Sequence, residues 1–276
     1  MITGRTACPS PIALAFLPFS VLVFVNIVSR MSLVRRFDHW RYERLARRAL
    51  LLERSSDDIR SRGFFSQCGQ DEYVAEQLFP GLRNGVFVDI GAHDGVSFSN
   101  TKYLEERLGW TGIAIEPLPA IFERLVRNRN CVCVNGCISS DSGVAKFRSI
   151  RGYSEMLSGL VARYDPKHLV RIESEVQSHG GQVEEIEVNC YRLNDLLVQN
   201  NVSRVHYLNI DVEGAEYDIL QSIDFDASDI LVCGVENNYR DYRIPALLKK
   251  RGYRMIALVG DEFYVKDDKR RKTHVG

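Results

Sequence analysis

The chain has 276 residues, which is enough for one substantial α/β domain with appended segments. Its 36 basic and 36 acidic residues give a formal net charge of +0, so no overall field favours nucleic acid as a partner. Seven cysteines, an odd number spread over predicted strands and loops, do not form a disulfide framework. The closely spaced Cys131, Cys133 and Cys137 lack the paired Cys-x-x-Cys pattern of zinc sites, which favours buried, reduced thiols.

The N-terminal region contains a long apolar run. Residues 9–29 carry no charged side chain, and residues 11–28 are almost wholly apolar. A membrane-spanning helix needs about 20 such residues and tolerates a proline such as Pro18. The run is long for a signal peptide, and no small-x-small cleavage site follows it, so residues 1–30 are predicted to be a retained single-pass membrane anchor. A cleaved signal peptide and a buried core helix are the second and third interpretations.

The charges on either side of this run predict its orientation. Only Arg5 precedes it, whereas seven arginines follow it within residues 30–48. By the positive-inside tendency, the folded part of the chain then faces the cytoplasm. Residues 31–63 are predicted to be an Arg-rich linker, in which residues 40–54 have the apolar spacing of a helix. This helix suits either the surface of an anionic membrane or a solvated linker.

The folded domain is predicted to cover residues 64–265, before a charged tail over residues 266–276. It opens with a helical pattern that ends at Leu78. Asp71 and Glu72 suit the first turn of this helix, because acidic side chains are favourable near a helix N-terminus.

The domain is organised around residues 85–95. An apolar run over residues 86–90 predicts a strand that is buried on both faces, with Asp89 near its end. Gly91 and Gly95 then permit a tight turn before the helix that follows. Strand, glycine turn and helix start together predict a nucleotide cradle in which backbone N–H groups face the ligand.

Asp89 indicates which kind of nucleotide such a turn binds. A dinucleotide site favours Gly-x-Gly-x-x-Gly, because a pyrophosphate must lie against bare backbone. A carboxylate at the first glycine position repels a diphosphate and suits a cationic ligand, such as the ammonium of a nucleoside-linked amino acid. The alternative is that Asp89 and Asp94 only bond nearby backbone N–H groups.

A second acidic strand end follows one crossover later. Residues 112–115 are an apolar strand that ends at Glu116, whose carboxylate can accept hydrogen bonds from both hydroxyls of a ribose. The turn-rich loop of residues 135–142 comes after the next strand. It offers a surface for an adenine at Gly136, Cys137 and Ile138.

The later part of the domain contains an irregular insertion. Residues 148–181 are predicted to be a surface loop, although substrate-binding loops and lids are often built from such insertions. Residues 253–259 and 262–265 predict a C-terminal hairpin about Gly260 and Asp261.

Two further strands end in acidic residues. Residues 205–210 form an apolar strand that ends at Asp211 and Glu213. In a doubly wound sheet, this turn neighbours the glycine turn at the ligand-binding edge. Residues 230–235 form another strand, which ends at Glu236 at the same edge.

Four segments of this domain resemble the FkbM family of S-adenosylmethionine-dependent methyltransferases. They are Val-Asp-Ile-Gly-Ala-His-Asp-Gly (88–95), Ser-Asn-Thr (99–101), Trp-Thr-Gly-Ile-Ala-Ile-Glu-Pro (110–117) and Leu-Asn-Ile-Asp-Val-Glu-Gly-Ala-Glu (208–216). Gly-Gln-Asp (69–71) and Val-Glu-Asn-Asn (235–238) match as well. In combination, these motifs are far more specific than a single glycine loop.

The resemblance implies an α/β fold with a Rossmann-like, doubly wound methyltransferase sheet. With the predicted hairpin, this sheet is mostly parallel with a C-terminal antiparallel hairpin, and it is preceded by the N-terminal hydrophobic helix, which lies outside the matched region. The resemblance also implies S-adenosylmethionine as cofactor, with its methionine part surrounded by Asp89, Gly91, Ala92, His93 and Gly95. Glu116 would then hold the ribose, and Pro117 and Cys137 complete the cofactor site. Asp211 would lie close to the sulfonium and to the acceptor, which is implied to be a hydroxyl of a small molecule or glycan.

Methyl transfer to a hydroxyl also needs a base that removes the proton. Asp211, Glu213 and His93 are the candidate bases, and Glu236 with Asn237 is expected to orient the acceptor. The alternative is that Asp211 and Glu213 cap the following helix, while His93 only bonds backbone. No metal is predicted, because Asp211 and Glu213 lack a third ligand for Mg²⁺.

Two other functions compete with methyl transfer. One is a membrane-tethered binding or trafficking protein that keeps the fold without the activity, but Asp89, Gly91, Gly95 and Glu116 are all intact. The other is a nicotinamide-dependent oxidoreductase, which is disfavoured by the carboxylate of Asp89.

Overall fold

The computed structural model describes residues 33–267 apart from residues 53, 153–156, 161–165 and 213. The predicted anchor at residues 11–28 lies outside these residues. Within the described part of the chain, no helix combines the length and the apolar character that crossing a membrane requires.

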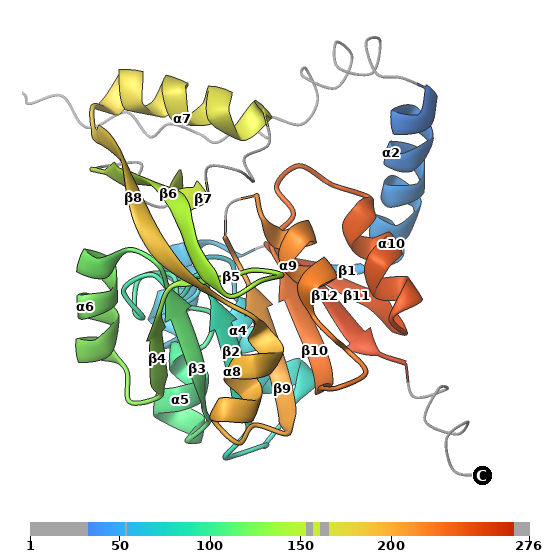
Figure 1. Cartoon of the computed structure of the whole chain (residues 1–276). Coiled ribbons are helices and arrows are strands. Elements are labelled where there is room, and N and C mark those ends of the chain that lie inside the picture. The colour runs from blue at the N-terminus through green and yellow to red at the C-terminus, as the bar shows by residue number, and fades with distance from the viewer. Residues whose placement is uncertain (1–32, 53, 153–156, 161–165, 213, 268–276) are drawn as a thin grey trace, which may run out of the picture.

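A large mixed sheet forms the centre of the molecule (Figure 1). Its strand order is β1 (Leu50–Leu51), β11 (Tyr253–Val259), β12 (Asp261–Lys266), β10 (Asp229–Val235), β9 (Arg204–Ile210), β2 (Val86–Ile90), β3 (Thr111–Glu116) and β4 (Val132–Asn135). β12 is antiparallel to β10 and β11, and the other neighbouring strands are parallel. This arrangement confirms the predicted mostly parallel sheet with a C-terminal antiparallel hairpin.

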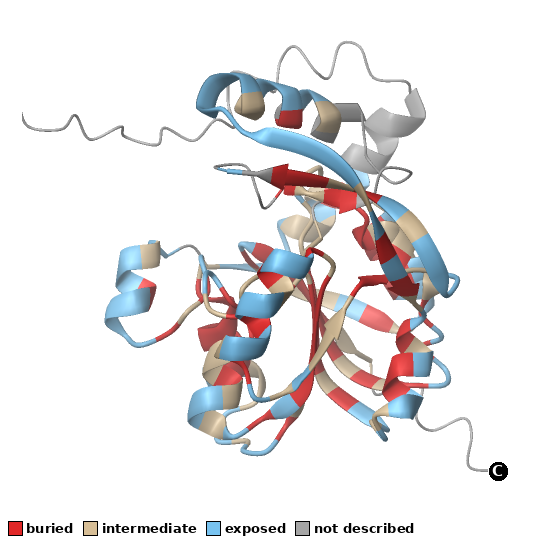
Figure 2. Cartoon of the chain, turned by 60° about the vertical axis from the view of Figure 1, so that its left-hand side comes forward, coloured by how far each residue is buried: buried red, intermediate tan, exposed pale blue. Residues whose placement is uncertain are grey.

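Helices cover both faces of this sheet, because successive side chains of each strand point to opposite sides. In β2, Phe87 packs on one face, whereas Val88 and Ile90 pack on the other. The first face is covered by α3 (Ser56–Ser61), α4 (Gln70–Glu72) with the π-helix η1 (Tyr73–Leu78), and α5 (Lys102–Leu108). The second is covered by α8 (Leu193–Gln199), α9 (Glu216–Ser222) and α10 (Arg243–Lys250). Figure 2 shows buried residues on the central strands and exposed residues on the outer sides of the helices.

A second, smaller sheet lies at the carboxyl-end side of the first, and it follows α6 (Pro119–Asn128) and β4 in the chain. Its order is β5 (Cys137–Ile138), β8 (Gln182–Tyr191), β6 (Gly143–Arg151) and β7 (Gly159–Leu160). Cys137, Phe147 and Val188 of this sheet pack against Leu118 and Ile121 at the start of α6. The second sheet is therefore anchored to the main sheet next to the end of β3.

The insertion predicted as a surface loop over residues 148–181 is largely regular, so that prediction was wrong. It contains the end of β6, strand β7 and the helix α7 (Pro166–His179). Ile172 and Val176, one helical turn apart, pack α7 against Ile150 and Leu157. Likewise, Cys137 and Ile138 belong to a strand instead of a turn.

Much of the predicted linker packs against the domain. The helix α2 (Leu33–Ala46) ends earlier than predicted, and β1 then pairs in parallel with β11. Tyr42 of α2 is 4% exposed, and its hydroxyl donates a hydrogen bond to Glu262 at 2.5 Å. Ile59 of α3 is fully buried. These segments are thus part of the packed unit, a role that the sequence did not predict.

Candidate active site

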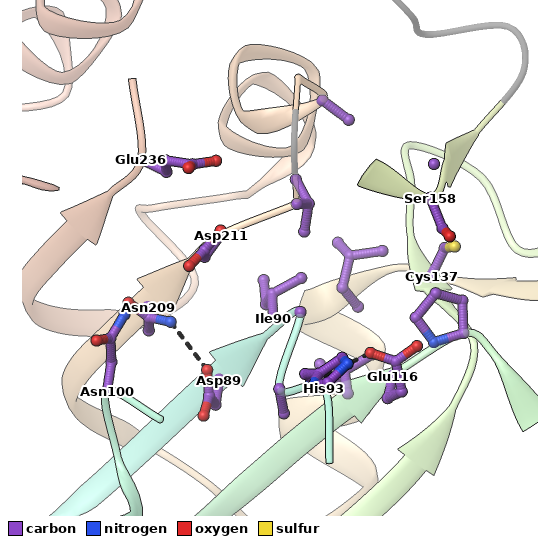
Figure 3. A pocket seen from close by; sticks show the side chains of 18 of the residues that line it. Asp89, Ile90, His93, Asn100, Glu116, Cys137, Ser158, Asn209, Asp211 and Glu236 are labelled. Atoms are coloured by element: carbon purple, nitrogen blue, oxygen red, sulfur yellow. Dashed lines mark hydrogen bonds between the residues drawn. The ribbon is translucent and has the colours of Figure 1, made fainter. Parts of the chain in front are cut away.

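The candidate site is a cavity at the carboxyl ends of β2, β3, β9 and β10. β2 lies between β3 and β9. After β2 the chain continues to β3 and β4 on one side of the sheet, whereas after β9 it continues to β10 on the other side. Such a switch point leaves a crevice above the strand ends, where open α/β sheets bind their ligands. Asp89, His93, Glu116, Asp211 and Glu236 line this cavity together, as predicted (Figure 3).

Asp89 is held by side chains instead of backbone N–H groups. Its residue is 2% exposed, and its two carboxylate oxygens accept hydrogen bonds from Asn209 Nδ2 at 2.9 Å and from Thr101 Oγ1 at 2.6 Å. Asn209 is the in-register neighbour of Asp89 on β9, and Arg129 Nη1 lies 3.9 Å from the carboxylate. These contacts fix the orientation of Asp89 at the wall of the cavity.

Arg129 is the centre of this buried network, and the sequence did not predict it. Its side chain is fully buried and donates to Thr101 Oγ1 at 2.9 Å and to the Glu105 carboxylate. Glu105 also accepts the backbone N–H groups of Asn130 and Cys131, at 2.7 and 2.8 Å. Removing one partner of a buried ion pair leaves an uncompensated charge. The packing of the residues that hold Asp89 therefore depends on this arginine.

Gly91 allows the turn after β2 to pass close to the turn after β9. Its φ is 89°, and a Cβ atom there would lie 1.8 Å from the carbonyl oxygen of Asp211. The backbone N–H of Asp211 donates to the Ile90 carbonyl at 3.0 Å, which joins the same two strand ends. The predicted tight turn at Gly91 is therefore present, and the group that approaches its backbone most closely is the protein's own β9 turn.

Replacing Gly91 with alanine should destabilise the fold more than the same change at Gly63. Both glycines have positive φ, 89° and 86°, but nothing lies within 4 Å of a Cβ at Gly63. Gly63→Ala should lower the free energy of unfolding by about 1 kcal/mol through backbone strain alone. Gly91→Ala adds steric overlap, which typically costs a further ~1–3 kcal/mol. Urea unfolding of both variants measures the difference, and equal losses would contradict the close approach.

His93 and Glu116 form one wall of the cavity (Figure 3). The Glu116 carboxylate accepts the backbone N–H groups of His93 at 3.2 Å and of Leu118 at 2.9 Å. His93 has a φ of 49°, which is uncommon for a residue with a side chain and often marks a functional turn. The second strand-end carboxylate thus lies beside the glycine turn, as the sequence predicted.

Asp94 and Gly95 stabilise the loop after β2 and are not in the cavity wall formed by His93 and Glu116. The carboxylate of Asp94 accepts the N–H groups of Val96 at 2.9 Å and Ser97 at 2.7 Å, which matches the alternative that the sequence left open for this residue. Gly95 is not among the described residues that line the cavity. A Cβ at Gly95 would lie 2.7 Å from Arg129 Cγ, so this glycine makes room for the buried arginine.

Asp211 and Glu236 come from neighbouring strand ends and point into the cavity (Figure 3). The Glu236 backbone N–H donates to the Ile210 carbonyl at 3.0 Å, which aligns the two turns. Burial raises the pKa of Asp211 to about 6, the charge of Asp89 adds to the rise, and a hydrogen bond with Glu236 opposes it. Asp211 is therefore mostly ionised at neutral pH and within easy reach of protonation, which suits a general base.

Three further cavity residues were not predicted as a group: Gln70, Asn100 and Asp261. Asp261 Oδ2 accepts from Gln70 Nε2 at 3.3 Å and from Asn100 Nδ2 at 3.4 Å. Burial raises the pKa of Asp261 well above its ordinary value, and the charge of Asp211 adds to this effect. Gln70 and Asn100 belong to the Gly-Gln-Asp and Ser-Asn-Thr motifs, but no local pattern in the sequence links either of them to Asp261.

The second sheet closes the other end of the cavity. Cys137 and Ile138 of β5 line it together with Glu116 and Pro117. Phe147 of β6 and Ser158, just before β7, belong to the same wall. The insertion therefore contributes directly to the site.

Ala92 also lines the cavity, whereas Glu213 lies outside the described residues. Among the residues that the structure describes, no group of three or more His, Cys, Asp or Glu side chains is placed to hold a metal ion. Cys131, Cys133, Cys137 and Cys190 are free thiols.

Comparison with known proteins shows which family the chain belongs to. Residues 89–255, more than half of the chain, match the model of the methyltransferase FkbM domain. The chain is also 29% identical over 178 residues to Methyltransferase 1 of Beauveria bassiana (strain ARSEF 2860), which covers 58% of this chain and 70% of that protein. The matched region begins at Asp89 and contains Glu116, Asp211 and Glu236. On these grounds the chain belongs to the FkbM family of methyltransferases.

Proposed function

We propose that this protein uses S-adenosylmethionine to methylate a hydroxyl group of an uncharged small molecule or glycan. The observation that carries the proposal is the pair of carboxylates, Asp89 and Glu116, which line one cavity at the switch point of the sheet and lie one crossover apart. A positively charged sulfonium nucleoside with an amino-acid end fits such a pair, whereas a diphosphate does not.

The residues around the cavity suggest how the cofactor would lie. Glu116 would accept hydrogen bonds from the ribose hydroxyls, and the apolar wall at Cys137, Ile138 and Phe147 would cover the adenine. The methionine part would lie along the glycine turn near Asp89, which places the sulfonium toward Asp211. When bound, the cofactor supplies an electrophilic methyl group, and the protein supplies alignment and a water-poor pocket.

The charges of the cavity favour an acceptor without negative charge. Five carboxylate residues line it, and no lysine or arginine is found among the described lining residues. The carboxylates are Asp89, Glu116, Asp211, Glu236 and Asp261. A phosphate or carboxylate on the acceptor would be repelled by those of the five that are ionised, whereas hydroxyl groups can donate hydrogen bonds to these oxygens. Asp211 would accept the hydroxyl proton, with Glu236 orienting the acceptor.

Glu116→Gln should weaken cofactor binding. The variant keeps the size of the side chain but loses the anionic acceptor, and a hydrogen bond to a charged group contributes about 1.5–3 kcal/mol. We expect the Kd for S-adenosylmethionine to rise by roughly 10- to 100-fold in isothermal titration calorimetry. Glu123→Gln on α6, where the side chain is 69% exposed, is the matched control and should bind as the wild type does. An unchanged Kd in Glu116→Gln would remove Glu116 from the cofactor site.

The proposed activity is tested by incubating the protein with methyl-labelled S-adenosylmethionine and a cell extract, then identifying the labelled product. The proposal expects label in an ether-linked methyl group of an uncharged, hydroxylated molecule. Cofactor binding without transfer to any extract component would favour the inactive binding protein. Label on a phosphate or carboxylate would contradict the proposed acceptor class.

A further inference from the structure

Outside the candidate active site, the chain has a surface that combines an exposed tryptophan with several exposed arginines. It is formed by Trp40 and the arginines that follow it at the end of α2. We define this basic–aromatic surface by its exposed members, Trp40, Arg44, Arg47 and Arg48. Trp40 is 54% exposed, and the short strand β1 that follows adds two exposed apolar side chains, Leu50 at 51% and Leu51 at 62%, which point to opposite faces of the strand.

The neighbouring side chains hold α2 firmly on the domain. Tyr42 donates to the buried Glu262, and Arg240 Nη1 donates to Glu43 at 2.6 Å. The guanidinium of Arg41 lies 5.1 Å from the centroid of the Tyr242 ring. Three consecutive residues of α2 are thus attached to the domain, which fixes the rotation of the helix about its axis.

This attachment determines which side chains face outward. Trp40, Arg44 and Arg47 follow one another at i, i+4 and i+7, so they lie along the face opposite Tyr42. The helical hydrogen bonding continues to Arg47, whose N–H donates to the Glu43 carbonyl at 3.0 Å. The Arg44 guanidinium lies 5.7 Å from the centroid of the Trp40 ring, which confirms that both side chains share this face.

We infer that the basic–aromatic surface docks on an anionic lipid bilayer. Tryptophan is favoured at the boundary between headgroups and acyl chains, and arginines near a membrane are attracted to anionic lipid. Between Trp40 and Leu51 the sequence contains one acidic residue, Glu43, and its carboxylate is bonded to Arg240. The same stretch contains Arg41 and the three arginines of the surface, so it carries a net positive charge. In the sequence, this surface also comes shortly after the uncharged residues 9–29. This inference does not depend on the proposed methyltransferase reaction.

The test uses the full chain with vesicles of phosphatidylcholine, with and without phosphatidylserine, that contain brominated phosphatidylcholine as a quencher. Of the two tryptophans, Trp40 is exposed and Trp110 is only 2% exposed, so quenching reports on Trp40. We expect the emission to be quenched in the anionic vesicles and much less in the neutral ones. Trp40→Phe should abolish the quenching while leaving the fold intact.

A charge-reversed variant tests the arginines. Arg44→Glu/Arg47→Glu should weaken binding to anionic vesicles by about 30-fold or more, because each basic residue contributes about one kcal/mol near such a surface. Arg124→Glu/Arg127→Glu on α6 is the matched control and should bind like the wild type, since α6 and α2 lie at opposite sides of the molecule (Figure 1).

Three outcomes would overturn the inference. Trp40 emission that is unquenched, or quenched equally with neutral vesicles, would show that this surface does not contact anionic lipid. Equal losses in the two charge-reversed variants would show that only the overall charge matters. Dimerisation without lipid that Arg44→Glu/Arg47→Glu abolishes would make the surface a contact between two copies of the chain.

Discussion

Replacing Asp211 with asparagine should reduce methyl transfer by about 10²- to 10⁴-fold, the usual contribution of a general base. The change keeps the shape of the side chain and its place between the turns of β2 and β10, but the amide cannot take up a proton. Binding of S-adenosylmethionine should change by only a few-fold. The measurements are the single-turnover rate with labelled cofactor and the Kd from calorimetry.

The pH dependence distinguishes a base from a positioning residue. Because the pKa of Asp211 is raised to about 6, the wild-type rate should climb as pH rises through that value and level off above it, as the carboxyl group loses its proton. This rise should be missing in Asp211→Asn. A variant that is slower but keeps the same rise would show that another group is the base, with Glu236 as the first candidate. Asp141→Asn, at an exposed position outside the cavity lining, is the control.

Replacing Arg129 with methionine should lower the free energy of unfolding by about 3–5 kcal/mol. Methionine fills much of the same space, but the Glu105 carboxylate loses its buried cationic partner and Asp89 loses the positive charge 3.9 Å away. Thr101 also loses the donor that holds its hydroxyl oxygen. Urea unfolding measures the loss, and the protein is expected to bind its cofactor more weakly because Asp89 is less well held.

Two further variants make this prediction specific. Arg127→Met lies two residues away, where the arginine is 74% exposed and pairs with the exposed Glu123, so it should change stability by less than about 0.5 kcal/mol. Glu105→Gln combined with Arg129→Met removes both charges of the pair and should recover part of the loss. A small loss in Arg129→Met alone, similar to that of Arg127→Met, would show that the network contributes little.

The sequence predicted the central sheet because its strands are buried on both faces and therefore form continuous apolar runs. Residues 86–90, for example, read unambiguously as a strand, and the glycine after it marks a turn that no other residue can form so close to Asp211. Carboxyl ends of neighbouring parallel strands meet at one edge. The acidic residues at these ends could thus be placed together from the amino-acid pattern alone.

The contacts that hold the site could not be predicted in the same way. Arg129 follows a helix whose other arginines are solvent-exposed, and nothing in the local pattern shows that its side chain turns inward toward Glu105 and Thr101. Tyr42 joins Glu262 across most of the chain, so this contact has no local signal at all. The assembly of a second sheet was not predicted, because β5 and β7 have only two residues each and most residues of β8 are exposed, so the local pattern does not indicate how these strands pair.

The most direct test is a crystal structure of the protein with S-adenosylhomocysteine, the product that remains after methyl transfer. We predict that the ribose hydroxyls lie within hydrogen-bond distance of the Glu116 carboxylate, with the adenine against Cys137 and Ile138 and the sulfur facing Asp211. A nucleoside bound elsewhere, or one whose ribose points away from Glu116, would contradict the assignment of this cavity as the methyltransferase site.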